Sequence, residues 1–176
     1  MNFSLEIGPK TDLETLPALK DVYITMLPGG DYKETAEQAK NLVQKGYNPI
    51  PHFPARSIEN EAQLKEYISM CRDGGTKQVL VIGGSREPIG KFDSSIQVLE
   101  TGYFEDMKIG IAGHPEGSPD ISDSKLEKAM KDKKPYADYI VTQWLLDPQP
   151  IIDFISKQSV PVHVGITGPL KISSLI

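Results

Sequence analysis

Five polar residues that could do chemistry lie at or just after the ends of short apolar runs: Thr25, His52, Ser85, His114 and Gln143. A hydroxyl, imidazole or amide group at such a position can bind a small molecule, and each can equally cap a strand end by a hydrogen bond. Parallel strands of a barrel direct their carboxyl ends to one rim, where active sites assemble. We therefore expect the five side chains to share a binding site.

Glu6 differs from these residues because it lies inside an apolar run, Ser4-Leu5-Glu6-Ile7-Gly8. A carboxylate that faces a protein interior needs a partner or a raised pKa. Carboxyl groups of this kind often serve as general acids. Glu6 is therefore a candidate proton donor.

Two glycine-rich segments could form ligand-binding loops. Gly83–Gly90 could hold a phosphate through backbone amides, although it lacks the GxGxxG and GK[ST] patterns and Pro88 interrupts any immediate helix. Gly113–Pro119 combines a histidine, a carboxylate and a hydroxyl, and is long enough to enclose a ligand. No His and carboxylate pair has helical metal spacing, and no nucleophile elbow is present, so neither a metal site nor a hydrolase triad is predicted.

Short apolar runs alternate with amphipathic helical patterns along the whole chain. The expected strands are Phe3–Ile7, Val22–Met26, Asn48–His52, Gln78–Ile82, Lys108–Ala112, Tyr139–Thr142 and Val160–Ile166. The expected helices are Asp31–Lys45, Asn60–Arg72, Ser94–Thr101, Ser124–Lys133 and Pro150–Lys157. Asp31 and Glu34 resemble a capping box, and Gly46 suits the residue just past a helix end. Pro49 and Pro51 weaken the prediction of the third strand.

The strand patterns favour a parallel sheet, because VLVI and IGIA lack the polar alternation of a half-exposed strand. Repeated βα units can close into a (β/α)8 barrel or wind into an open sheet, and the number of strands favours the barrel. A complete barrel takes roughly 250 residues. We therefore expect residues 1–176 to form a single, C-terminally truncated α/β barrel domain with about seven of eight parallel strands, ending as a further helix begins at Ser173–Ile176.

Composition and charge point to small-molecule partners. The net charge is −5 with acidic and basic residues interleaved, which argues against nucleic-acid binding and against a polybasic membrane segment. No apolar run approaches the ~20 residues of a membrane-spanning helix. The single cysteine, Cys71, lacks CxxC spacing and fits a reducing, cytoplasmic setting.

Several motifs, taken in order, resemble the methylenetetrahydrofolate reductase family. They are Ser4-Leu5-Glu6-Ile7-Gly8-Pro9-Lys10, Ile24-Thr25, Pro51-His52, Ile111-Ala112-Gly113-His114-Pro115-Glu116, Thr142-Gln143-Trp144-Leu145-Leu146-Asp147 and Gly165-Ile166-Thr167-Gly168-Pro169. The resemblance covers nearly the whole chain. It implies a (β/α)8 barrel that binds FAD at its C-terminal rim and reduces 5,10-methylenetetrahydrofolate to 5-methyltetrahydrofolate with NADH or NADPH.

The resemblance also assigns roles to individual residues. Glu6 matches the general acid that protonates N10 of the folate, and Gln143 matches the residue that hydrogen-bonds the pterin. The positions that match flavin contacts are Thr25, His52, Ser85, His114 and Lys133, the last through an alignment with a one-residue gap. A homo-oligomer is expected for the full-length protein.

Two departures from the family pattern leave alternatives open. Ser85 stands where many members have an aspartate, so a negative charge near the flavin and pterin is lost. Ser118 stands where a histidine often contacts FAD, and a nearby cofactor-binding aspartate falls at or beside Leu126. The alternatives are a non-catalytic folate-binding homologue and a barrel enzyme of one-carbon metabolism that does not hold FAD tightly.

Overall fold

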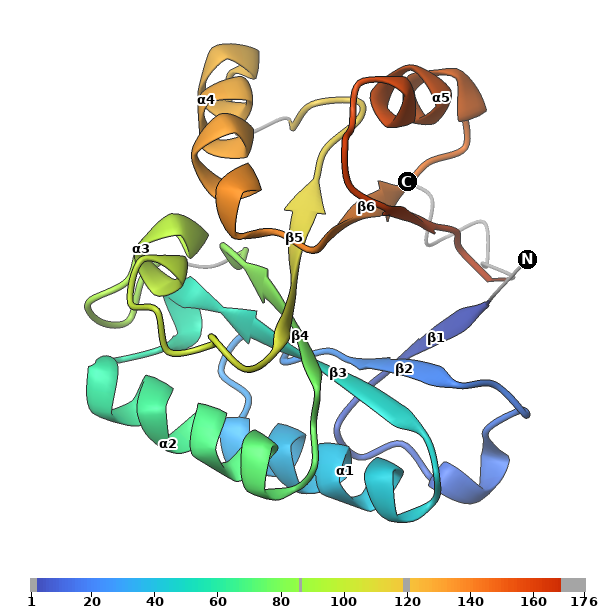
Figure 1. Ribbon diagram of the computed structural model, residues 1–176, viewed down its shortest axis with the longest axis vertical. Coiled ribbons are helices and arrows are strands. Elements are labelled where there is room, and N and C mark those ends of the chain that lie inside the picture. Colours follow the sequence, from blue (N-terminus) through green and yellow to red (C-terminus); the bar gives the residue numbers. More distant parts are fainter. Residues whose placement is uncertain (1–2, 86, 119–120, 169–176) are drawn as a thin grey trace. The chain divides into compact units, whose positions relative to one another are not determined.

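The computed structural model describes residues 3–85, 87–118 and 121–168, in which strands and helices alternate (Figure 1). The strands are β1 (Ser4–Ile7), β2 (Asp21–Ile24), β3 (Asn48–Pro54), β4 (Gln78–Ile82), β5 (Lys108–Gly113), β6 (Tyr139–Trp144) and β7 (Val162–Gly165). The helices are α1 (Tyr32–Gln44), α2 (Glu61–Asp73), α3 (Ser95–Leu99), α4 (Asp123–Lys133) and α5 (Pro148–Ser156), with three 3-10 turns at Leu13–Thr15, Ala55–Ser57 and Lys134–Tyr136.

The strands follow one another in the sheet in sequence order, from β1 to β7. The pairs β1 with β2, β2 with β3, β3 with β4, and β6 with β7 are parallel. This is the α/β alternation of an incomplete (β/α)8 barrel, which confirms the predicted fold class. The described residues contain seven of the eight strands that a closed barrel needs. The helix expected at Ser173–Ile176 lies outside the described residues.

The chain divides into two compact units, Met1–Gly110 and Ile111–Ile176, and the boundary falls within β5. We call them the N-terminal unit and the C-terminal unit and describe each by itself. A single barrel domain over residues 1–176 stays a prediction.

In the N-terminal unit, α1 and α2 lie side by side and α1 covers one face of β2 and β3 (Figure 1). Strand alternation sends every second side chain of β1 and β2 toward α1. The buried cluster so formed consists of Ile7, Val22, Ile24, Ala39 and Leu42. Because this cluster uses the odd residues of β1 and the even residues of β2, Glu6 and Tyr23 belong to the opposite face.

The ends of α1 follow from local sequence. The Asp31 carboxylate accepts a hydrogen bond from the Lys33 N–H at 2.8 Å, which caps the helix. The expected capping box is incomplete, because Glu34 forms an ion pair with Lys10 at 2.9 Å instead of reaching back to Asp31. Gly46 follows the helix with φ of 86°, a conformation that favours glycine.

The strand β3 runs two residues beyond its predicted end and includes both prolines that weakened the prediction. Pro49 and Pro51 pair with Val22 and Ile24 of β2, whereas the register with β4 begins only at His52. The missing N–H groups of the prolines therefore fall where β3 is not in register with β4. Behind β3, the Phe53 ring stacks on Tyr67 of α2 with centroids 4.0 Å apart.

In the C-terminal unit, the outer side of β6 packs on α5. A side-chain carbon added at Gly113 would lie 2.7 Å from Ile140 and 2.8 Å from the Phe154 ring, so β5, β6 and α5 approach closely at this point. Ile140 therefore faces α5, and by alternation Tyr139 and Val141 belong to the other face. In line with this assignment, the Tyr139 ring stacks on His163 of β7.

Among residues 3–85, 87–118 and 121–168, no helix has the length and apolar character needed to cross a membrane.

Candidate functional site

The N-terminal unit carries a row of chemically active side chains on the face of β1–β3 that points away from α1, which we call the Glu6 face. Glu6 pairs in register with Tyr23 of β2, and Tyr23 pairs with Ile50 of β3. The Tyr23 ring meets the His52 ring edge-on, with centroids 6.1 Å apart and planes at 68°. The Glu6 face thus places a carboxyl, a phenol and an imidazole on three neighbouring strands.

Glu6 is exposed rather than enclosed in the interior, as its place in an apolar run had suggested, yet the protein around it removes enough water to raise the pKa of its carboxyl. Desolvation acts in this direction because it disfavours the charged form. A carboxyl group with a raised pKa holds a larger share of protons near neutral pH and can donate one to a bound substrate. The chemistry expected of Glu6 is therefore compatible with its surroundings.

His52 is 6% exposed, and burial lowers the pKa of its imidazole to about 4. Its ring is therefore neutral at neutral pH. Within the described part of the chain, its Nε2 atom is buried without a hydrogen-bond partner. The backbone is held from behind, because the Tyr67 hydroxyl donates to the His52 carbonyl oxygen at 3.0 Å. A buried polar atom without a partner is costly, so Nε2 is a natural contact for a ligand.

Thr25 and Ser85 follow β2 and β4. The Thr25 N–H donates to the Ile7 carbonyl at 2.9 Å, which joins the end of β2 to that of β1. Ser85 is exposed and lies three residues beyond the last residue of β4. Together with Glu6 and His52, these residues stand at or beyond the carboxyl-terminal halves of four consecutive strands.

The glycine-rich segment after β4 is tied to the chain before α2. The Ile89 N–H donates to the Arg56 carbonyl at 3.1 Å, and just beyond the segment the Lys91 N–H donates to the Glu59 carbonyl at 2.8 Å. The Ile89 amide is therefore bonded to the protein, and phosphate binding by the other amides of Gly83–Gly90 stays a prediction.

In the C-terminal unit, His114 follows β5 and is half-buried. Burial, with a smaller contribution from the charge of Lys133, lowers the pKa of its imidazole. Lys133 is the last residue of α4 and is 7% exposed, and its ammonium donates to the Ala112 carbonyl at 3.2 Å. Burial lowers the pKa of Lys133. His114 and Lys133, which are distant in sequence, thus influence each other electrostatically.

Gln143 lies one residue before the end of β6 and is exposed. The strand was expected to end at Thr142, but it continues to Trp144 through an irregular register with β7 between Val141 and Trp144. The Thr142 hydroxyl accepts a hydrogen bond from the Gly165 N–H at 3.0 Å across this irregularity. Gln143 is therefore presented by a distorted strand end rather than by a loop.

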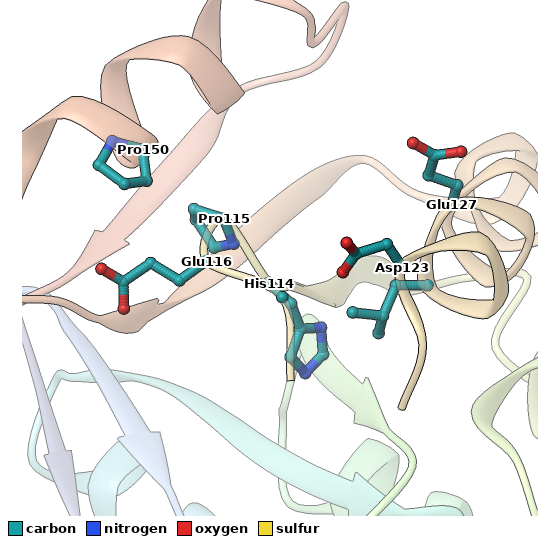
Figure 2. Close-up of a pocket in the computed structure, with 8 residues that line it drawn as sticks. His114, Pro115, Glu116, Asp123, Glu127 and Pro150 are labelled. Carbon is teal, nitrogen blue, oxygen red and sulfur yellow. The ribbon is translucent and has the colours of Figure 1, made fainter. Parts of the chain in front are cut away.

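A cavity of about 630 Å³ lies between the loop after β5, the start of α4 and Pro150 of α5, all in the C-terminal unit. We call it the acidic cavity. Figure 2 shows that His114 and Glu116 come from the loop, whereas Asp123 and Glu127 come from α4. The expectation that the segment Gly113–Pro119 could enclose a ligand agrees with this position, since residues 114–117 line the cavity.

Within the described ranges, no three His, Cys, Asp or Glu side chains are grouped so as to hold a metal ion. Cys71 is buried in α2, and burial raises the pKa of its thiol to about 12.

Comparison with known proteins gives a distant sequence match and a clear fold match. No family model matches the chain. Methylenetetrahydrofolate reductase 1 of Schizosaccharomyces pombe is 25% identical over 166 residues, covering 82% of this chain and 27% of that protein. The chain is a distant relative of this reductase. It spans only about a quarter of the relative's length.

Two crystal structures from Burkholderia cenocepacia J2315 share the fold. One is a proposed lyase/mutase, with a TM-score of 0.64 and 13% identity, covering 88% of this chain and 63% of that one. The other is a proposed phosphonomutase, with a TM-score of 0.65 and 13% identity, covering 99% of this chain and 82% of that one. At this identity the likeness supports the fold alone.

Three residues of the two sites were not predicted from the sequence: Tyr23, Asp123 and Glu127. Tyr23 sits in the apolar run of β2 and looks like an ordinary core residue, although strand alternation places it on the same face as Glu6. Asp123 and Glu127 are four residues apart on α4, so they share one side of the helix, and this spacing was the available signal.

Proposed function

We propose that the protein reduces 5,10-methylenetetrahydrofolate to 5-methyltetrahydrofolate, with a flavin as cofactor and NADH or NADPH as electron donor. The observation that carries the proposal is the Glu6 face, where a carboxyl with a raised pKa lies in register with Tyr23, whose ring in turn meets the neutral ring of His52. The distant relation to methylenetetrahydrofolate reductase gives this arrangement a chemical context.

The Glu6 face suits the ring system of a flavin in one respect. The buried Nε2 atom of His52 lacks a partner among the described residues, and a planar heterocycle with polar edges could supply one. A bound flavin would provide the hydride that reduces the one-carbon group. The protein would bind and orient the rings and exclude water.

In this proposal the protonated form of Glu6, which the raised pKa favours, delivers its proton to N10 of the folate as the five-membered ring opens. Gln143 is proposed to hydrogen-bond the pterin. Thr25, His52, Ser85, His114 and Lys133 are the proposed flavin contacts. For Lys133 this role requires its ammonium to exchange the hydrogen bond that it makes with the Ala112 carbonyl.

The test combines absorption spectra with a Glu6→Gln variant. Purified protein supplied with flavin should lose its yellow absorption on addition of NADH or NADPH and regain it on addition of methylenetetrahydrofolate. Loss of a general acid typically costs about 10²- to 10⁴-fold in rate. We expect Glu6→Gln to slow the folate step by about this factor and to leave flavin reduction unchanged.

The matched control is Glu105→Gln, which removes an exposed carboxylate of the same unit. It should alter neither step. A Glu6→Gln protein that reduces the folate at full rate would show that Glu6 is not the proton donor.

A second candidate function is folate binding without catalysis. It is favoured by Ser85, an exposed hydroxyl where many reductases of the family have an aspartate. A neutral hydroxyl supports a developing positive charge on the substrate less than a carboxylate does. Protein that binds methylenetetrahydrofolate but binds no flavin would favour this function.

A further inference from the structure

We infer that Tyr23 is a positioning residue of the Glu6 face, whose ring stands between Glu6 and His52 and fixes the orientation of the His52 imidazole toward a ligand. That this placement serves folate reduction rests on the proposed function. The placement itself concerns the N-terminal unit alone and can be tested without flavin or folate.

Tyr23 occupies the middle of the row that carries the two polar groups. Its Cα pairs with that of Glu6 on β1 and with that of Ile50 on β3. His52 lies two residues beyond Ile50 and so belongs to the same face of β3. Neighbouring strands lie about 4.8 Å apart, so β2 and the side chain that it places on this face separate β1 from β3. Tyr23 therefore adjoins both Glu6 and His52.

The contact that orients His52 is made by the ring of Tyr23. The two ring centroids are 6.1 Å apart with planes at 68°, an edge-to-face arrangement that aromatic pairs prefer. Tyr23 is 5% exposed, so its own ring is held by packing. The Tyr67 hydroxyl fixes the carbonyl of His52 but not its side-chain torsions. Among the described residues no hydrogen bond reaches Nε2, so the Tyr23 ring is a contact that limits rotation of the imidazole.

The same ring keeps water from the groups on both of its sides. The elements around His52 contribute Glu6 from β1, Tyr23 from β2 and Tyr67 from α2, and Leu80 pairs with it on β4. Desolvation lowers the pKa of His52 to about 4 and raises the pKa of Glu6. Loss of the ring should therefore raise the pKa of His52 and lower that of Glu6. A loss of stability in a protein that is still folded would not produce this pair of opposite changes.

The experiment measures the pKa values of His52 and Glu6 by NMR titration of the 176-residue chain without flavin. The two signals are identified by their absence from the spectra of His52→Gln and Glu6→Gln. The test variants are Tyr23→Leu and Tyr23→Met, which both replace the ring by aliphatic bulk, so that the test does not depend on the folding of one variant. Each should raise the proton affinity of His52 at least about tenfold and should lower the pKa of Glu6.

Two control variants separate the ring from other effects. Tyr23→Phe keeps the ring, and Tyr47→Leu removes a ring that packs against the cluster around Leu42 on the α1 side of the sheet. Both should leave the proton affinities of His52 and Glu6 within about twofold of the unmodified chain. With flavin and folate supplied, Tyr23→Leu should slow the folate step at least about tenfold, whereas Tyr23→Phe should stay within about threefold of the unmodified rate. Circular dichroism checks that the variants are folded.

The inference is overturned if Tyr23→Leu and Tyr23→Met leave the pKa of His52 or that of Glu6 unchanged. It is also overturned if Tyr23→Phe or Tyr47→Leu changes these pKa values as much as Tyr23→Leu does. Failure of the proposed function looks different, because the two pKa values would then respond to the loss of the Tyr23 ring as expected, but the unmodified protein would not reduce the folate.

Discussion

The Glu6 face and the acidic cavity differ in how deeply the elements that carry their side chains are buried. On the Glu6 face, His52 is buried and held from behind by Tyr67, on strands whose other side packs into the cluster around Leu42. The acidic cavity instead uses α4, whose one buried side chain among those described is Lys133. The first arrangement holds side chains in fixed positions, whereas the second presents charge to solvent. We therefore expect substitutions in the two units to differ in kind.

The largest difference should come from a matched pair of helix leucines. Leu42 of α1 is completely buried, whereas Leu126 of α4 is only partly buried. Leu42→Ala should lower the free energy of unfolding by about 2–5 kcal/mol, since it leaves a cavity in a packed core. Leu126→Ala should cost about 1 kcal/mol or less. Urea unfolding followed by circular dichroism measures both, and equal losses would contradict the contrast between the units.

The second-largest expected effect is a pH dependence of the folding stability that is caused by His52. The pKa of its imidazole is about 4 in the folded protein against an ordinary value of 6.5. Between these values the unfolded chain binds a proton that the folded chain does not, so stability falls as the pH is lowered through this window. Below the folded pKa the loss levels off, at roughly 3 kcal/mol.

Urea titrations from about pH 7 to about pH 4.5 measure this dependence. His52→Gln should flatten the curve, and the part of the slope that disappears is the contribution of His52. His114→Gln, in the half-exposed site, should remove a smaller part. If His52→Gln leaves the slope unchanged, His52 is not held neutral by burial.

The smallest expected effect is a difference in stability between substitutions at the N-terminal ends of α1 and α4. Asp31 caps α1 with a hydrogen bond to Lys33, whereas Ser122 precedes α4 without a side-chain cap bond. Asp31→Ala should therefore cost about 1 kcal/mol of unfolding free energy. Ser122→Ala should stay within about 0.5 kcal/mol of the unmodified chain. Thermal unfolding can distinguish these values, and a larger loss for Ser122→Ala would reverse the expected order.

Most of the fold could be predicted because strand and helix periodicity is local. β4 has the bounds expected from its apolar run, and α2 (Glu61–Asp73) lies one residue later than the expected Asn60–Arg72, because Asn60 caps the helix instead of starting it. The misjudged ends have local causes. β6 was expected to end at Thr142, yet the pairing of Trp144 with Gly165 of β7 carries the strand on to Trp144.

The candidate sites were predictable in part. Position at strand ends indicated Thr25, His52 and His114, and the motif around Glu6 indicated the acid. Whether His52 would be buried without a partner for Nε2 depends on the packing of Tyr23 and Tyr67, which lie far from it in sequence. The acidic cavity likewise depends on how the loop after β5 packs near α4. This is a tertiary contact that no local sequence pattern predicts.

The bonded segment after β4 also bears on protein engineering. A side-chain carbon at Gly90 would lie 2.0 Å from the Glu59 carbonyl oxygen, so no other residue fits there without moving the backbone. The hydrogen bonds at Ile89 and Lys91 join the same two stretches. Anyone who grafts a new loop at residues 87–91 would therefore need to transplant residues 56–59 with it, because the two stretches act as one exchangeable module.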